Sequence, residues 1–390
     1  RKESSAASDV YKRQSLEKSI DLKMSYNKMI LNEGHLYISG FGSSKYYLKA
    51  FDINSVKDIS LKKDWSFSSS ISISLKKRTI FVKELSYTDI PTDFTCEDIH
   101  YLGEGEGMSL SAFYKVDLDL LEVFDKKIFY GNINQHIDSE NEYLYTASST
   151  DTFIINEKNN FSTQITGVIP GKFGLKEKDN HLLLFTEKRT SNNLTVLSHD
   201  LEYVYTLNGI APGEDIYSVK FESDRAYLVT FETIDPLFSF DISNVGAPKL
   251  ISELKVPGFS RYMQVLGAER LVTFGKEFGD WYSDVEINLY DTKKDLTKLS
   301  SLSISGVKDL SVFWNHHNIE IHGDYIFLKN YNQVLVLEVF EDRLLELGSI
   351  SLKSFYSAAQ VMGYLNELRV FENGILRRYD LTSSLLEIDE

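Results

Sequence analysis

Short apolar runs separated by polar turns fill almost the whole chain. Runs such as HLYIS, RAYLVTF and ELRVF are rich in β-branched and aromatic side chains, and turn-forming residues bound them. This pattern is typical of β-strands, whereas long stretches with helical spacing are scarce. The alternation therefore predicts an all-β chain.

A short phrase recurs at the end of many of these strands: an aromatic residue or Val, then Asp, then Ile, Leu or Thr. Its aspartates are Asp52, Asp117, Asp241, Asp291 and Asp380. A carboxylate in this place accepts backbone N–H bonds in an Asx turn, so we expect the five residues to shape turns rather than to catalyse. Self-similarity at about 40–50 residues, with several short strands in each period, indicates a β-propeller.

The repeat predicts eight four-stranded blades of roughly 47 residues each. Their second strands are centred near Leu36, Ile80, Leu144, Leu183, Leu228, Leu271, Ile326 and Leu368. Seven blades is the alternative, which would apply if the weakest unit, residues 71–130, is irregular. Residues 16–22 look like an outer strand that completes the last blade beside Leu385–Ile388, which would remove an exposed sheet edge.

The first fourteen residues are set apart from the repeat. They contain no apolar stretch, so they do not form a signal peptide, and DVYKRQ resembles a translated sequencing adapter. We interpret residues 1–14 as a non-native or disordered leader and residues 15–390 as a single propeller domain. On this interpretation an export signal would precede the sequence given.

Charge and cysteine content narrow the class of partner. The formal net charge is −15, so a phosphate backbone would be repelled and a nucleic-acid partner is disfavoured. The one cysteine, Cys96, excludes an intrachain disulfide, which fits either the cytosol or a secreted domain with a large core. No apolar run is long enough to form a transmembrane helix.

Residues 209–275 carry the most distinctive sequence. The segments are Ala211–Glu214 (APGE), Tyr217–Val219 (YSV), Asp235–Leu237 (DPL) and Ile251–Phe259 (ISELKVPGF), together with GVIPG at 167–171 and NGILRRYDL near the end. They resemble secreted bacterial and archaeal proteins with a C-terminal β-propeller distantly related to WD40 repeats. The resemblance implies export and a propeller but no reaction. Residues 314–323, WNHHNIEIHG, depart from the pattern of that family.

One face of the expected propeller is the best candidate for function. Loops between second and third strands share this face with the connections between blades, and loops on a rigid scaffold often bind ligands. Three connections carry Pro-Gly pairs that we expect to form turns, namely Pro170-Gly171, Pro212-Gly213 and Pro257-Gly258. The longest loops, residues 87–109 and 275–285, belong to the same face.

These loops contain oxygen ligands and aromatic side chains. The candidate binding residues are Glu277, Asp280, Trp281, Tyr282, Asp284, Glu104, Glu106 and Trp314. Their spacing matches no calcium-binding loop, so we predict no metal and no cofactor, although Ca²⁺ is the ion that such acidic loops would take. The Gly-Glu alternation around Glu104 is either an acidic arm for a basic partner or a disordered excursion.

Two classes of function fit these features. The favoured one is a non-catalytic binding or scaffold propeller of the cell envelope or extracellular space, monomeric, with a protein or glycan partner. The alternative is an enzyme with acidic residues in the central channel, a hydrolase or lyase acting on glycans or phosphate esters, with Ca²⁺ as its candidate ion. A regulatory propeller attached to a further domain is a third hypothesis. Fold alone does not separate them.

Overall fold

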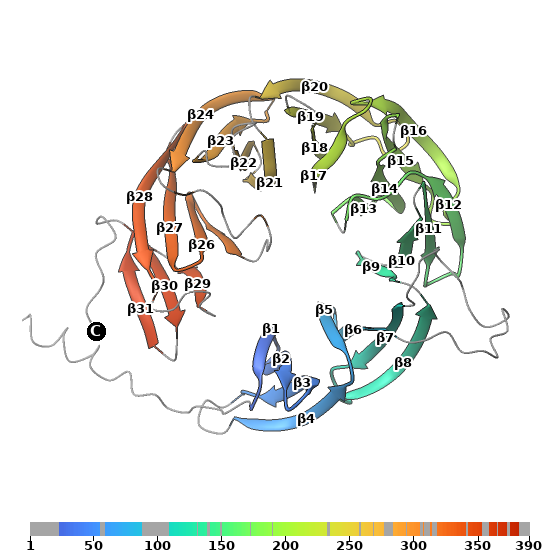
Figure 1. The fold of residues 1–390 in the computed structure, drawn as a ribbon, viewed down its shortest axis with the longest axis vertical. Coiled ribbons are helices and arrows are strands. Elements are labelled where there is room, and N and C mark those ends of the chain that lie inside the picture. The colour runs from blue at the N-terminus through green and yellow to red at the C-terminus, as the bar shows by residue number, and fades with distance from the viewer. Residues whose placement is uncertain are drawn as a thin grey trace, which may run out of the picture. The chain divides into compact units, whose positions relative to one another are not determined.

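The computed structural model describes the chain from residue 23 to residue 381. Within that range it leaves out residues 55–58, 88–108, 131, 139–140, 149, 172, 189, 232–234, 257–258, 268, 277–283, 294, 305–306, 308–312, 314–317, 341, 353–358, 365 and 373–374. The described residues form eight antiparallel sheets, seven with four strands and one with three. Figure 1 shows them in chain order. This confirms the prediction of an all-β chain with eight repeat units.

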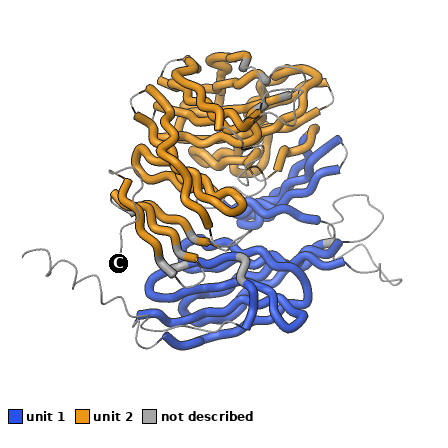
Figure 2. The backbone as a smooth tube through the Cα atoms, turned by 60° about the vertical axis from the view of Figure 1, so that its left-hand side comes forward, with its two compact units in different colours: residues 1–165 blue, residues 166–390 orange. Residues whose placement is uncertain are grey.

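The chain divides into two compact units, residues 1–165 and 166–390, which Figure 2 colours separately. Unit 1 contains three sheets. The first sheet is β1 (Ser25–Asn32), β2 (His35–Gly42), β3 (Lys45–Asp52) and β4 (Ser60–Phe67); the second is β5 (Ser70–Lys76), β6 (Thr79–Tyr87), β7 (Ser109–Asp117) and β8 (Glu122–Tyr130); the third is β9 (Asn134–Ile137), β10 (Glu142–Ala147), β11 (Asp151–Asn156) and β12 (Ser162–Thr166).

Unit 2 contains the other five sheets. The fourth is β13 (Leu175–Lys178), β14 (His181–Thr186), β15 (Asn192–Leu197) and β16 (Tyr203–Ile210); the fifth is β17 (Asp215–Glu222), β18 (Arg225–Phe231), β19 (Asp235–Asp241) and β20 (Lys249–Val256); the sixth is β21 (Phe259–Leu266), β22 (Arg270–Lys276), β23 (Val285–Asp291) and β24 (Thr297–Ile304); the seventh is β25 (Ile319–His322), β26 (Tyr325–Asn330), β27 (Gln333–Phe340) and β28 (Arg343–Ser351); the eighth is β29 (Gln360–Tyr364), β30 (Glu367–Glu372) and β31 (Ile375–Asp380).

All eight predicted second strands are present, as β2, β6, β10, β14, β18, β22, β26 and β30. The described part of residues 71–130 forms a regular four-stranded sheet, so the eight-unit prediction is correct and the seven-unit alternative is wrong. The strands expected to close the last unit, residues 16–22 and 385–388, lie outside the described residues.

The core lies between consecutive sheets of each unit. One cluster of buried side chains joins the fourth and fifth sheets through Phe185, Val196, Leu228 and Phe240. In unit 1, further clusters join the first sheet to the second and the second to the third. In unit 2, they join the fifth sheet to the sixth, the sixth to the seventh and the seventh to the eighth. Where both faces of a sheet are covered in this way, a middle strand can be buried almost throughout rather than alternating, as in β22 of the sixth sheet, where all but the first residue are buried.

Candidate functional site

Most of the binding-loop residues predicted from the sequence lie outside the described part of the chain. These are Glu277, Asp280, Trp281, Tyr282, Glu104, Glu106 and Trp314, and the turn pair Pro257-Gly258 lies outside it as well. Asp284 is described: it is half-buried and immediately precedes β23. Their proposed part in binding stays a prediction.

The recurring aspartates make local turn bonds. The backbone N–H of Asn54 donates to Asp52 Oδ1 over 3.0 Å. Equivalent bonds run from Asp119 to Asp117, from Ser243 to Asp241 and from Lys293 to Asp291. Asp380 ends β31, and the second residue after it is outside the described range. The carboxylates of Asp52, Asp117, Asp241 and Asp291 are therefore engaged with their own turns.

The residue after each of these aspartates adds a second constraint that the sequence did not reveal. The N–H of Ile242 donates to the carbonyl of Asp224 over 2.9 Å, which ties the end of the third strand to the turn between the first two. Ile53, Leu118, Thr292 and Leu381 make the same kind of bond. In the first, second, fifth and sixth sheets, the recurring phrase is thus explained by two hydrogen bonds: one from a turn N–H to the Asp carboxylate and one between backbone groups.

The Pro-Gly pairs at 170–171 and 212–213 lie in connections between sheets. The N–H of Glu214 donates to the carbonyl of Ala211 over 3.2 Å, and Gly213 has a φ of +86°. A type II turn needs this left-handed conformation at its third residue, which favours glycine. Gly171 also has a positive φ, of +70°.

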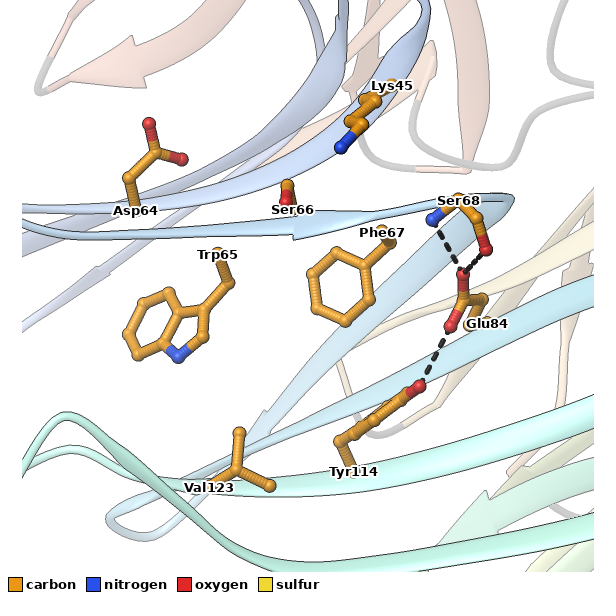
Figure 3. Close-up of a pocket in the computed structure, with 9 residues that line it drawn as sticks. All are labelled: Lys45, Asp64, Trp65, Ser66, Phe67, Ser68, Glu84, Tyr114 and Val123. Atoms are coloured by element: carbon orange, nitrogen blue, oxygen red, sulfur yellow. Dashed lines mark hydrogen bonds between the residues drawn. The ribbon is translucent and has the colours of Figure 1, made fainter.

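A cleft of about 630 Å³ between the first and second sheets is the best candidate site in the described structure. We call it the aromatic cleft; it is lined by Lys45, Asp64, Trp65, Ser66, Phe67, Ser68, Glu84, Tyr114 and Val123. In Figure 3, Trp65 and Phe67 project from β4 toward Val123 and Tyr114 of the second sheet. Both sheets belong to unit 1.

Strand periodicity brings the aromatic side chains to one side of the first sheet. In the pairing of β3 with β4, Leu48 is opposite Trp65 and Tyr46 is opposite Phe67, so all four lie on the side that packs on the second sheet. Phe67 meets Tyr114 edge-on, with ring centroids 5.5 Å apart. Trp65, nearer the start of β4, is only half-buried and its ring borders the opening.

A buried carboxylate fixes the inner end of the aromatic cleft. Glu84 Oε1 accepts hydrogen bonds from the N–H groups of Ser68 and Ser69, at 2.9 and 3.0 Å, and from the Ser68 hydroxyl. Its Oε2 accepts the Tyr114 hydroxyl at 2.8 Å. Burial, together with the bond to Glu84, raises the pKa of Tyr114 to about 12, so this phenol is a neutral donor at physiological pH.

The rim of the aromatic cleft carries uncompensated positive charge. Asp64 is paired with Lys49 at 2.8 Å, whereas Lys45 forms no ion pair with any residue that the structure describes. Lys126 lies 5.2 Å from the Tyr114 ring centroid, and within the same described range it too lacks a carboxylate partner. The Glu84 carboxylate lies at the inner end, hydrogen-bonded to Ser68, Ser69 and Tyr114, whereas Lys45 and Lys126 add positive charge nearer the opening.

Two smaller clefts of unit 1 are occupied by ion pairs. In the first, of about 310 Å³, Arg78 bridges Glu33 at 2.5 Å and also binds Asp119. In the second, of about 330 Å³, Lys115 pairs with Glu142 at 2.7 Å. Arg78 and Lys115 thus already have carboxylate partners, so the aromatic cleft is the stronger candidate for an external ligand.

The comparisons with known proteins identify the fold family. A model of the beta propeller domain family matches residues 7–340. The chain belongs to this family. The match confirms the propeller resemblance found in the sequence, and the eight sheets are accordingly the blades of an eight-bladed propeller.

Two archaeal relatives match part of this propeller. An uncharacterised protein of Methanocaldococcus jannaschii is 30% identical over 200 residues, which is 48% of this chain and 31% of the relative. An uncharacterised protein of Archaeoglobus fulgidus is 33% identical over 159 residues, which is 39% of this chain and 24% of that protein. The match thus spans less than a third of either relative.

Solved structures share the architecture at low sequence identity. BamB from Moraxella catarrhalis has a TM-score of 0.51 at 11% identity, over 90% of this chain and 96% of that one. The dihydro-heme d1 dehydrogenase NirN, in complex with DHE, has a TM-score of 0.53 at 11% identity, over 91% of this chain and 72% of that one. At such identity the likeness shows the fold alone.

No group of three or more His, Cys, Asp or Glu side chains within the described part of the chain is placed to hold a metal ion. No helix in the same part is both long and apolar enough to cross a membrane.

Proposed function

We propose that this propeller is a non-catalytic binding protein whose ligand occupies the aromatic cleft. The observation that carries the proposal is the cleft itself: three aromatic rings and Val123 line an open space of about 630 Å³, with a few polar groups at its edge. Ligand sites in proteins commonly combine an apolar lining with a small number of fixed polar groups. Glu84 holds the connection that forms its inner end, so the shape exists before a ligand arrives.

The wider setting follows from the family resemblance. A role outside the cytoplasm, in the cell envelope or extracellular space, is supported by the likeness of residues 209–275 to secreted propeller proteins. The partner classes that fit an aromatic cleft are proteins and glycans, because both present apolar surface beside hydrogen-bonding groups. We propose a monomer, since each sheet obtains its apolar contacts from neighbouring sheets of the same chain.

The test selects ligands from a random peptide library and from a mixed glycan array, with wild type and Trp65→Ala in parallel. We expect ligands whose affinity falls about tenfold or more in Trp65→Ala, corresponding to about 1.4 kcal/mol, and which are recovered unchanged by mass spectrometry. Phe161→Ala, which removes another exposed ring of unit 1, is the control and should bind normally. Ligands that ignore Trp65, or that return chemically altered, would overturn the proposal.

A further inference from the structure

The outer strand of the second sheet borders the aromatic cleft and carries unusual apolar exposure. In the pairing of β7 with β8, Val123, Lys126 and Ile128 lie on the same side as Tyr114. Val123, Phe124 and Ile128 are 41, 58 and 47% exposed. Among the described strands, β8 pairs only with β7, so its other edge has no strand partner within that part of the chain. Exposed apolar edges of this kind favour the addition of another strand.

The charges at the cleft have the spacing of an extended chain. On β4, Lys63 lies two residues before Trp65 and on the same side of the strand, while Lys126 is beside Tyr114 on the facing wall. In an extended peptide, residues two apart also share one face. A ligand with a central apolar side chain and an acidic side chain two positions away would therefore match the ring and the cation together.

From these observations we propose that the ligand of the aromatic cleft is an extended acidic–apolar segment of a partner protein, added as a strand beside β8. Its central aromatic or aliphatic side chain enters between Trp65 and Tyr114, and its flanking carboxylates face Lys45, Lys63 and Lys126. Backbone hydrogen bonds to the β8 edge supply affinity, as in other complexes formed by strand addition, and the cleft supplies specificity. This inference rests on the proposed function and names the ligand class for the same site.

The observations favour a peptide over a glycan. A sugar would use the ring of Trp65 but would leave the edge of β8 and its apolar side chains Phe124 and Ile128 in water. A neutral glycan would also leave Lys45 and Lys126 without a negatively charged partner among the described residues. An acidic peptide strand would contact the Trp65 ring, the β8 edge and the lysines together. Because the chain as a whole has a net charge of −15, the positive charge at this rim differs in sign from the protein's net charge.

The test uses a fluorescein-labelled, end-capped peptide with the sequence ETWTE, in which both Glu and the Trp share one face. Fluorescence anisotropy should show saturable binding to the full chain, and the lysine analogue KTWTK should bind at least tenfold more weakly. Lys45→Glu combined with Lys126→Glu should weaken ETWTE binding at least tenfold. Lys249→Glu, an exposed lysine of unit 2, is the matched charge control and should bind as wild type.

Two further measurements separate this inference from the broader proposal. N-methylation of alternate peptide amides removes backbone donors, so a strand-added peptide should lose at least tenfold in affinity in one of the two methylation registers. Val123→Glu places a negative charge, the same sign as that of the peptide, on the exposed rim and should weaken ETWTE binding at least tenfold. Circular dichroism checks that this variant is folded. Binding that is indifferent to methylation in both registers, or to both charge changes, overturns the inference. Trp65-dependent binding of glycans alone overturns it too, but leaves the proposed binding function standing.

Discussion

At the scale of single residues, the recurring aspartates act through their own turns. The backbone and side chain of Ser243 hydrogen-bond to Asp241 and hold the pKa of that carboxyl below its ordinary value of 3.8. Asp52 has a lowered pKa for the same reason, through the N–H of Asn54. A lowered pKa in the folded state means that the ionised form stabilises the fold, so these turns couple stability to pH.

Asp241→Ala should lower the free energy of unfolding of unit 2 by about 1 kcal/mol near neutral pH, because one charge-assisted turn bond is lost at a partly solvated site. Because the folded pKa is depressed, this contribution is fully present above pH 3.8 and is lost as the pH falls through the folded pKa. Urea titrations from pH 6 downward should therefore show the two proteins converging in acid. Asp241→Asn, which keeps an oxygen acceptor, should lose less, and a difference that grows in acid would contradict the assignment.

Glu84 is the residue on which the shape of the aromatic cleft depends most. Glu84→Ala removes the acceptor of two backbone N–H groups and two hydroxyls, and should destabilise unit 1 by about 2–3 kcal/mol. Tyr114→Phe removes one of these bonds and should cost about 1 kcal/mol. Denaturant unfolding measures both changes. Equal losses in the two variants would mean that the Ser68–Ser69 connection does not depend on Glu84.

At the scale of elements, the strands were predictable because short runs of apolar residues in the sequence indicate which segments are buried. β14 reads HLLLFT, and all but its first residue are buried, as expected for a short apolar run in the middle of a sheet. β4 reads SLKKDWSF and is mostly exposed, yet its two aromatic side chains two residues apart mark one face. That spacing was the available signal for the aromatic cleft.

The aromatic cleft itself was not predictable from the sequence. Trp65 and Tyr114 come from different sheets, and the long segment between β6 and β7 separates them along the chain. The repeat indicates that consecutive sheets pack, but not where the separation between β4 and β8 leaves space. The sequence instead predicted binding in the long loops, residues 87–109 and 275–285. Most of the candidate residues in these loops, including Trp281 and Glu104, lie outside the described structure.

Connections between sheets depend on backbone conformation at single glycines. Gly213→Ala should destabilise unit 2 by about 1 kcal/mol, because φ at this residue is +86° while a new Cβ would meet no atom within 4 Å. The cost is thus conformational rather than steric. Gly246→Ala is the matched control, because its φ is not in the left-handed range, and it should change little. Thermal unfolding compares the two, and equal shifts would argue against the type II turn.

At the scale of the whole molecule, stability is shared between neighbouring sheets rather than concentrated in one core. Phe240 of the fifth sheet is fully buried among side chains of the fourth, including Phe185 at a ring-centroid distance of 5.4 Å. The same arrangement repeats at other junctions within each unit. In such repeat architectures a sheet is stable chiefly through its interfaces. Removing one interface side chain should therefore affect both sheets that share it.

Phe240→Ala tests this directly and should cost about 3–5 kcal/mol, because the cavity left between two rigid sheets cannot collapse fully. Native-state hydrogen exchange should show amides of β14 and β15 losing protection together with those of β18 and β19. The reason is that side chains of both sheets pack in the same cluster as the Phe240 ring. Phe340→Ala, at an exposed position of β27, should change exchange by less than about 0.5 kcal/mol. If the fifth sheet alone lost protection, each sheet would be an independent folding unit. The idea that neighbouring sheets stabilise one another through their interfaces would then be wrong.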